Sequence, residues 1–378
     1  MKLLHLSDLH IGKRVNEFSM LEDQEYILTK IINIVDEEAP DAVLICGDVY
    51  DKSVPSAEAV ALFDEFLVRL SKRNLKTFVI SGNHDSPERI AFGARLMDAS
   101  GVYMSPVYSK DIEPVKLEDK HGDVNIYMLP FIKPAHVRAH FPESTIESYT
   151  DAVQTAIDHL GVNKAERNIL LTHQFVTGSE RSESEDISVG GSDNISAFVF
   201  DVFDYVALGH IHKPQSIGRE TLRYSGTPLK YSFSEAGHKK SVTVIDMEEK
   251  GSVSIHTADL IPKRDMREIK GTYMELTAKS FYSALNIEDY YHITLTDEED
   301  VLDAMNKLRV IYKNIMKLDY DNKRTRKGAV INGISDLESK SPLELVSEFY
   351  ELQNNQPVSE EQKTFLSDLI EKIWEEDK

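Results

Sequence analysis

The chain has 378 residues, an apolar fraction of 41% and a formal net charge of −21 at pH 7. This length predicts two or three domains with a sizeable core. No apolar run reaches the roughly 20 residues of a membrane helix, the N-terminal apolar stretch is too short for a secretory signal, and one cysteine excludes a disulfide framework, so we expect a cytoplasmic protein. The acidic charge argues against a general nucleic-acid binder, whose surface is normally basic.

The first 260 or so residues alternate strand-like and helix-like segments. Apolar positions at helical spacing predict helices over residues 21–36 and 54–70. Strands that alternate with helices indicate an α/β fold with parallel neighbours. Five apolar runs have the character of buried strands, and they cover residues 3–7, 42–46, 77–81, 168–172 and 205–209.

Later segments have strand character with few helices between them. Together they predict a second, mixed or antiparallel sheet packed on the first. The segments are 125–130, 222–226, 241–246 and 252–256.

A linker at residues 261–264 divides the chain into three expected parts. Residues 1–262 form the main domain, 263–335 a small α+β cap domain, and 336–378 a two-helix segment. Both tail helices begin with a capping-box pattern, at Ser341 and at Ser359. Two amphipathic helices either dock on their own domain or offer a surface to a partner. The acidic, Ser-rich and Gly-rich segment 177–193 is expected to be a long loop, and long loops are often functional.

A short polar cluster follows each of the five strand-like runs. In an open α/β sheet the ligand crevice lies outside the carboxyl ends of the strands, so these clusters are expected to meet. Asp, Asn and His supply the oxygen and nitrogen ligands of divalent cations. Each cluster alone is a weak indication, but five after five apolar runs predict a site for a pair of cations. The clusters are Asp8-Leu9-His10, Gly47-Asp48, Gly82-Asn83-His84-Asp85, Thr172-His173 and Gly209-His210-Ile211-His212.

Such a pair suits phosphoester cleavage. Two cations about 3.5–4 Å apart can activate water, neutralise the phosphoryl oxygens and stabilise the leaving oxygen. Asp48 is the natural bridging ligand, and Gly47 lets the backbone turn sharply off its strand. The other candidate ligands are Asp8, His10, Asn83, His173, His210 and His212.

Asp8 and His10 alternate along an expected extended segment, so both should face the same side.

Two further residues have candidate roles in catalysis. His84, near the cations but not on them, could protonate the leaving alkoxide, and such general acid catalysis raises the rate by about 10²–10⁴-fold. Asp51 could hold the His84 imidazole in its useful tautomer.

The motifs resemble those of the calcineurin-like metallophosphoesterases, and within that superfamily the chain closely resembles the SbcCD-type nuclease subunits of double-strand-break repair over nearly its whole length. The fold that this implies is a two-sheet α/β sandwich flanked by helices (αββα), with a DNA-capping α+β domain and a C-terminal helical pair. The segments that carry the closer resemblance are 4–12, 82–86, 209–214 and 224–228.

The resemblance implies two manganese ions, although the same ligands would accept iron, cobalt or zinc. It assigns His84 the transition-state and leaving-group role. Many relatives have a histidine where this chain has Asp51, while an acid there suits the wider superfamily. One ion is implied to bind Asp8, His10, Asp48 and His212, and the other Asp48, Asn83, His173 and His210.

The resemblance also implies an activity and partners. The activity is ATP-stimulated 3′→5′ exonuclease action on duplex ends, with endonuclease action on hairpins and single strands, in DNA repair, recombination and replication. The chain has no G-x-x-x-x-G-K-[ST] motif, so a separate SbcC-type coiled-coil ATPase, bound through residues 341–374, would hold the nucleotide. A homodimer would form through residues 54–70 or 88–97. Candidate phosphate contacts, each of which could equally be a solvated side chain, are Lys13, Arg14, Lys52, Arg89, Lys213 and residues 323–327.

Two other functions fit the same motifs. A stand-alone dinuclear-metal phosphomonoesterase or protein phosphatase would share the metal core and suits the acidic charge, but it requires neither the cap nor the two-helix tail. A non-catalytic scaffold for the ATPase would need none of the ligand clusters.

Overall fold

The computed structural model describes residues 1–185, 193–323, 325, 342–354 and 356–376. It divides into two compact units, Met1–Asp265 and Met266–Lys378. Among the described residues, no helix is both long enough and apolar enough to cross a membrane.

The first sheet of the larger unit has six strands in the order β14-β13-β1-β4-β5-β6. β1, β4, β5 and β6 are parallel, whereas β13 runs antiparallel to both β1 and β14. The strands are β1 (Lys2–Leu6), β4 (Ala42–Cys46), β5 (Lys76–Ile80), β6 (Val102–Met104), β13 (Ser241–Met247) and β14 (Val253–Asp259).

The second sheet has the order β11-β12-β10-β9-β8-β7 and is mixed, as expected. Its four central strands are parallel, and β7 and β11 add antiparallel edges. The strands are β7 (Val115–Asp119), β8 (Gly122–Leu129), β9 (Arg167–His173), β10 (Tyr205–Gly209), β11 (Gln215–Ile217) and β12 (Arg219–Tyr224).

One part of the predicted sheet assignment is wrong. The segments that became β13 and β14 were expected in the second sheet, but they pair in the first. The physical reason is that β1 would otherwise leave an unpaired edge beside a parallel sheet, and the returning chain covers it.

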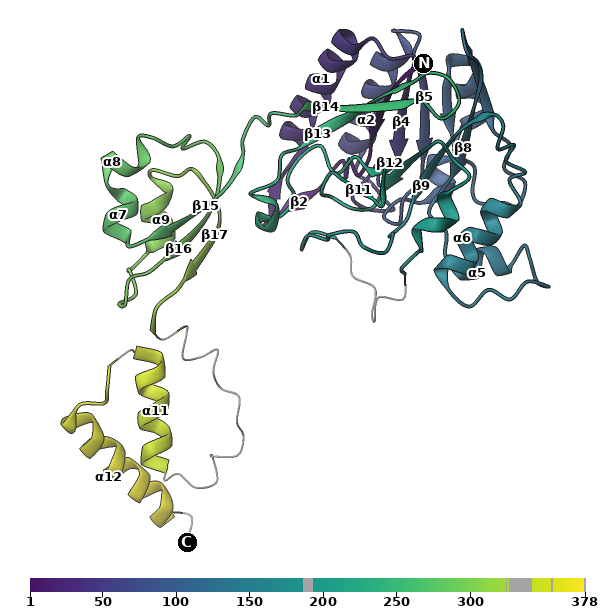
Figure 1. Ribbon diagram of the computed structural model, residues 1–378. Helices are drawn as coiled ribbons and strands as arrows, with labels where there is room; N and C mark the ends of the chain where they lie inside the picture. The colour runs from purple at the N-terminus through teal and green to yellow at the C-terminus, as the bar shows by residue number, and fades with distance from the viewer. Residues whose placement is uncertain (186–192, 324, 326–341, 355, 377–378) are drawn as a thin grey trace. The chain divides into compact units, whose positions relative to one another are not determined.

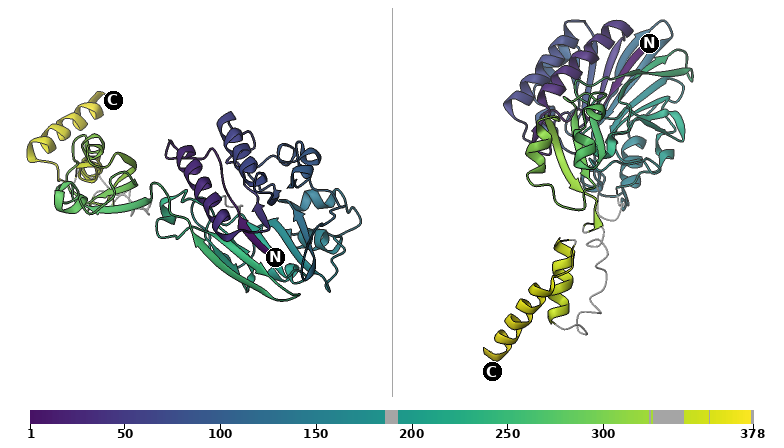
Figure 2. Two further views of the ribbon diagram at one scale, coloured as in Figure 1. Left: turned by 90° about the horizontal axis from the view of Figure 1, so that it is seen from above. Right: turned by 90° about the vertical axis from the view of Figure 1, so that its left-hand side faces the viewer.

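The two sheets pack face to face. Alternate residues of each central strand point into one buried apolar cluster, because successive side chains of a strand face opposite sides. That cluster joins Leu44 and Phe78 of the first sheet to Ile126, Leu171 and Tyr205 of the second. Helices α1 (Leu21–Glu38) and α2 (Ala57–Ser71), purple and blue in Figures 1 and 2, lie beside the first sheet.

Helix positions follow from local sequence. α1 buries Ile27, Ile31 and Val35 at helical spacing. α2 begins after Ser56, whose side chain accepts a hydrogen bond from the amide of Ala59, so the helix starts later than the expected residue 54. α6 (Tyr149–Asp158) packs on the outer face of the second sheet. The shorter elements are β2 (Arg14–Val15), β3 (Phe18–Ser19), α3 (Pro87–Ile90), α4 (Ala94–Met97), α5 (Pro134–Arg138) and 3-10 turns at Asp98–Ser100, Ala197–Phe200 and Phe233–Glu235.

The smaller unit contains a parallel three-stranded sheet in the order β15-β16-β17. Its core includes Leu276, Tyr291, Leu308 and Tyr312. In the tail, the amide of Gln362 donates to the Ser359 side chain and its own side chain accepts from the Ser359 amide, which forms the expected capping box, whereas Ser341 lies outside the described residues. The elements are β15 (Met266–Gly271), α7 (Tyr273–Thr277), α8 (Lys279–Tyr282), β16 (Tyr290–Leu295), α9 (Ala304–Arg309), β17 (Asn314–Tyr320), α11 (Pro342–Asn354) and α12 (Glu360–Glu376).

An ion pair ties strand ends together where β9 begins. The buried guanidinium of Arg167 donates to both carboxylate oxygens of Asp119, at 2.6 and 3.1 Å, and to the carbonyl of Glu248 at 2.8 Å. Arg167 therefore links the β7–β8 hairpin of the second sheet to the β13–β14 turn of the first. This pairing holds the pKa of Asp119 well below its usual range.

We predict that Asp119→Asn lowers the free energy of unfolding by about 1–3 kcal/mol at neutral pH, because it weakens the acceptor of a buried guanidinium. The pKa of Asp119 is depressed in the folded state, so its contribution is fully present above the unfolded value, about 3.9, and is lost as the pH falls through the folded value. Urea denaturation should therefore show a gap between wild type and variant that narrows below about pH 4. Asp123→Asn, on a half-exposed neighbour 3.7 Å from Lys116, is the control. An equal gap at pH 3 and pH 7 would contradict this role.

Candidate metal centre

The five polar clusters meet at the carboxyl ends of β1, β4 and β5 in one sheet and of β9 and β10 in the other. The chain leaves its strands there in the left-handed region, with φ of 53° at Asp8, 44° at His10, 48° at Asp48 and 104° at His210. The expected extended alternation of Asp8 and His10 is therefore wrong. Their side chains still converge, because the backbone turns at each of them instead of continuing as a strand.

The main chains approach so closely that several glycine positions have no room for a side chain, Gly82 and Gly209 least of all. A Cβ on Gly82 would lie 2.1 Å from the Oδ1 of Asp48, and one on Gly209 would lie 1.8 Å from the carbonyl oxygen of Cys46. Both distances are far below any real contact. Glycine at these two positions lets the strand ends of the two sheets meet around Asp48.

Asp85 holds two of the converging loops together. Its buried carboxylate accepts hydrogen bonds from the amides of Val49, Tyr50 and Gly82, at 3.1, 2.9 and 2.9 Å. The loop after β4, which carries Asp48, is thereby attached to the loop after β5. Burial and the nearby Asp48 raise the pKa of Asp85 to about 6.

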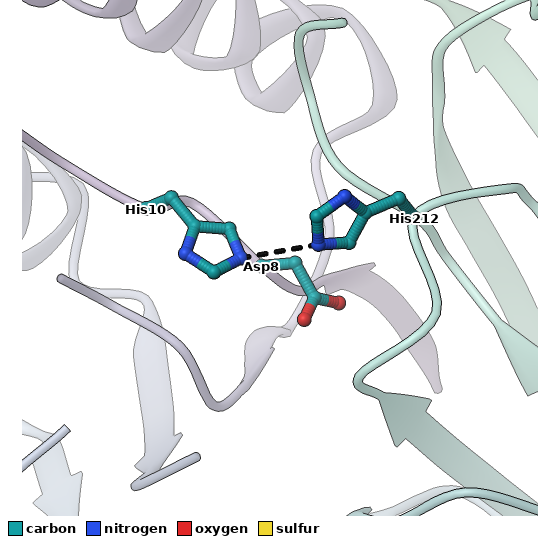
Figure 3. Close-up of side chains that lie close together, drawn as sticks. All are labelled: Asp8, His10 and His212. Carbon is teal, nitrogen blue, oxygen red and sulfur yellow. Dashed lines mark hydrogen bonds between the residues drawn. The ribbon is translucent and has the colours of Figure 1, made fainter. Parts of the chain in front are cut away.

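One group of ligand atoms comes from Asp8, His10 and His212, all buried and within 4.8 Å of one another. Figure 3 shows the three side chains pointing toward a common space, with the Nε2 atoms of the two imidazoles 3.2 Å apart. The Nδ1 of His10 is buried and has no hydrogen-bond partner among the described residues. Facing imidazole nitrogens beside a carboxylate are what a bound cation needs.

A second group gathers Asp8, Asp48 and His173. The Nε2 of His173 lies 3.3 Å from Asp48 and 3.0 Å from the amide oxygen of Asn83. That amide oxygen is also 2.9 Å from the Nδ1 of His210. The Asp48 carboxylate lies 3.7 Å from the Nε2 of His10 as well, and with His10 and His84 it forms a third group of possible ligands.

Hydrogen bonds to the main chain orient these ligands. The Nδ1 of His173 donates to the carbonyl of Cys46 at 2.8 Å, which leaves Nε2 facing the centre. The Asp8 carboxylate accepts from the amide of His210, at 3.0 and 3.1 Å. Each of these contacts crosses from one sheet to the other.

Burial and mutual charge shift the pKa values of the cluster in opposing directions. Burial raises the pKa of Asp8 to about 6 and lowers that of His210 to about 3. For Asp48, burial opposes ionisation, but the surrounding imidazoles, His173 first, hold its pKa well below the usual range. For His173, burial is outweighed by Asp48, and its pKa rises to about 9. Metal ligands must be deprotonated, and this set of carboxylate, imidazole and amide donors fits divalent transition metals.

His84 lies at the edge of the centre. Its ring is 4.9 Å from that of His10, and its Nε2 is 3.9 Å from Asp48. Its Nδ1 is 3.1 Å from the main-chain carbonyl of Asp51. The expected partner was the Asp51 carboxylate, but that group instead accepts from the ammonium of Lys13 at 2.8 Å.

Residues that sequence reasoning missed hold His212. The hydroxyl of Ser184 lies 2.6 Å from the Nδ1 of His212 and 2.6 Å from the carboxylate of Glu235. The buried Glu235 is paired with the buried Lys240 at 2.5 Å, and the ammonium of Lys240 also donates to the carbonyl of His212 at 2.8 Å. Glu185 accepts from the amide of His212 at 2.7 Å. The one available sequence indication was the acidic 177–193 segment.

The basic residues predicted as phosphate contacts lie in different surroundings. Lys13 lies against Asp51 at the centre, whereas Lys213 forms an ion pair with Glu180. Of the run 323–327, only 323 and 325 belong to the described residues.

Two family models match most of the chain. Residues 1–214 match the family model described as calcineurin-like phosphoesterase, and residues 262–354 match that of a type 5 capsule protein repressor C-terminal domain. The chain is 34% identical over 322 residues to the D subunit of nuclease SbcCD from Staphylococcus epidermidis, and the match covers 84% of this chain and 85% of the relative.

Two solved structures show a weak similarity to this chain. The protein TT1561 of Thermus thermophilus has 15% identity and a TM-score of 0.41, over 69% of this chain and 99% of the other. A dimetal phosphatase from Danio rerio has 10% identity and a TM-score of 0.42, over 69% and 96%.

The sandwich and its buried Asp/His centre define a calcineurin-like phosphoesterase with a divalent-metal site. Within this class the chain belongs to the SbcD family of nuclease subunits.

We predict that weakening the support of His212 lowers metal affinity. Ser184→Ala leaves the Glu235–Lys240 ion pair intact and should reduce Mn²⁺ affinity by about 10–100-fold, because the imidazole loses its orienting partner. Glu235→Gln should act in the same direction. Calorimetric titration of metal-depleted protein measures the effect, with Glu183→Gln on the same segment as the control. Unchanged affinity in Ser184→Ala would show that the hydroxyl has no positioning role.

Proposed function

We propose that the protein is a manganese-dependent DNA phosphodiesterase, the nuclease subunit of an ATP-driven SbcCD-type complex. The convergence of the ligand side chains from both sheets around Asp48 is the observation that carries this proposal. Relationship to the D subunit of an SbcCD nuclease supports DNA as the substrate. The activities proposed are 3′→5′ exonuclease action on duplex ends and endonuclease action on hairpins and single strands, in DNA repair, recombination and replication.

Two cations are proposed, with Asp48 shared between them. When bound, they supply a nucleophilic water at neutral pH and neutralise the phosphoryl oxygens. The ligands proposed for the first ion are Asp8, His10, Asp48 and His212, and for the second Asp48, Asn83, His173 and His210.

His84 is proposed to give its proton to the leaving oxygen. Its Nδ1–H donates to the carbonyl of Asp51, so Nε2, on the side of Asp48, is the nitrogen that carries the transferred proton. Asp51 thus acts on His84 through its main chain, while its carboxylate holds the ammonium of Lys13. Lys13 is then a group that could contact a phosphate beside the centre.

The second part of the proposal concerns partners. Residues 263–335 are proposed to cap the DNA, and the helices within 341–374 to bind the coiled-coil base of an SbcC-type ATPase. Exposed aromatic side chains support the latter: Phe349 in α11 is 64% exposed and Phe365 in α12 is 67% exposed. For a homodimer, the segment 88–97 is favoured over 54–70, because Phe92 and Leu96 are both 83% exposed.

A comparison of DNA with a phosphomonoester as substrates tests the catalytic proposal. We expect purified protein with Mn²⁺ to cleave linear and hairpin DNA and to turn over p-nitrophenyl phosphate only weakly. His84→Gln should reduce DNA cleavage by about 10²–10⁴-fold, because the leaving oxygen is no longer protonated, while bound manganese stays the same by elemental analysis. Strong monoester turnover without DNA cleavage would instead identify a phosphomonoesterase, and loss of manganese in His84→Gln would contradict the role of His84.

Co-purification tests whether the C-terminal helices bind the ATPase subunit. With the ATPase subunit co-expressed, Phe349→Asp combined with Phe365→Asp should abolish complex formation, because two charges would be buried in an apolar contact. Leu302→Asp, at a residue 84% exposed outside the tail, is the matched control. If the double variant still co-purifies with the ATPase, the tail is not the binding segment.

A further inference from the structure

A cavity of about 250 Å³ opens beside Asn83 and His210 in the larger unit. Three aromatic side chains, Phe131, Tyr149 and Phe175, form part of its lining. None of the roles proposed above uses these residues.

The aromatic walls continue directly from the metal centre. The ring of Phe131 lies 6.2 Å from that of His173, and the ring of Phe175 lies 6.4 Å from that of His210, both in edge-to-face arrangement. Both phenylalanines are only partly buried. A group attached to a phosphate at the centre would therefore meet aromatic rings next.

Polar groups around these rings suit a heteroaromatic partner. Gln174 is 1% exposed; its Nε2 donates to the carbonyl of Ile132, and its Oε1 has no hydrogen-bond partner among the described residues. A buried acceptor left without a donor costs free energy, so a ligand that brings an N–H would be favoured there. Lys133 also lines the cavity and lies 5.9 Å from the centre of the Phe131 ring.

Arg181 reinforces the same wall. Its guanidinium lies 3.4 Å from the centre of the Phe175 ring and 3.3 Å from the carboxylate of Asp193. Its Nε is buried without a partner in the described part of the chain. Arg181 thus holds the Phe175 ring in place, although it is not itself among the residues that line the cavity.

We propose that this cavity, the Phe131–Phe175 pocket, binds the nucleobase of the nucleotide next to the scissile phosphate. Aromatic rings stack on any base, and base edges carry the N–H groups that the Oε1 of Gln174 lacks as partners. A base that enters the pocket has left its own stack, so the seated nucleotide is single-stranded or frayed. This inference rests on the proposed phosphodiesterase function and specifies what that site recognises beyond the phosphate.

The test uses substrates with a single phosphodiester. Full-length protein with Mn²⁺ is assayed on the dinucleotide dApdA and on two analogues in which one or the other adenosine is an abasic tetrahydrofuran residue. Removing the base that occupies the pocket should lower kcat/KM of the wild type by about 5–100-fold, the loss expected for one base–aromatic stack. Removing the other base should have a much smaller effect, which also tells which side of the phosphate the pocket serves.

The matched variant is Phe175→Leu, which keeps an apolar side chain but removes the π face. It should lower kcat/KM on dApdA by a similar factor and change nothing further on the abasic analogue that the wild type cleaves slowly, because ring and base act as one pair. Phe198→Leu, at a phenylalanine 62% exposed outside the lining, should match the wild type throughout. Mn²⁺ affinity of Phe175→Leu should equal that of the wild type, which separates this role from support of His210.

Other results would overturn the inference. Equal wild-type rates on dApdA and both analogues would show that no base is read. Equal slowing of all substrates by Phe175→Leu would mark the ring as structural. If the wild type cleaves linear DNA but none of the three diesters, a single neighbouring base does not suffice for recognition and the pocket proposal fails; if it cleaves neither, the proposed function fails as well.

Discussion

Everything at this centre depends on placing two carboxylates and several imidazoles in one buried space at the meeting point of two sheets. Asp8 and Asp48 would repel each other there without the imidazoles, and the strand ends come so close that Gly82 and Gly209 have no room for a Cβ. Contacts from Asp8 to the His210 amide and from His173 to the Cys46 carbonyl join the sheets across this space. The sandwich and its ligand cluster therefore stabilise each other, and a divalent cation would neutralise the charge that burial concentrates.

Prediction from the sequence succeeded best where an apolar strand pattern ends at a cluster of candidate ligands. Strand ends at residues 46 and 209 were predicted because an apolar run stops at a polar cluster, and the structure brings those clusters together. Sheet membership of β13 and β14 was predicted wrongly, because pairing between β1 and β13 depends on residues about 240 positions apart rather than on local pattern. The left-handed turns at Asp8 and His10 were also missed, since a strand-like run gives no indication of where the backbone leaves the sheet.

The residues that hold the candidate metal ligands in place were the hardest to predict from the sequence. Glu235 and Lys240 look like ordinary surface charges in sequence, yet both are buried and reach His212 together with Ser184. Asp51 was predicted to act through its carboxylate, but its main-chain oxygen faces His84. Such roles depend on side-chain geometry across long sequence separations. The net charge of −21 is likewise no guide to the exposed surface alone, because some of the acidic residues are buried in the centre and its supports.

The three amides held by Asp85 have a consequence for how the centre is assembled. Because one carboxylate satisfies Val49, Tyr50 and Gly82, the segments bearing Asp48 and Asn83 are already locked to each other before any ion arrives. The side chains of Ser184 and Glu185 hold His212 in the same way from a separate segment. The protein itself therefore orders both halves of the ligand cluster, so that capture of an ion costs little further conformational entropy.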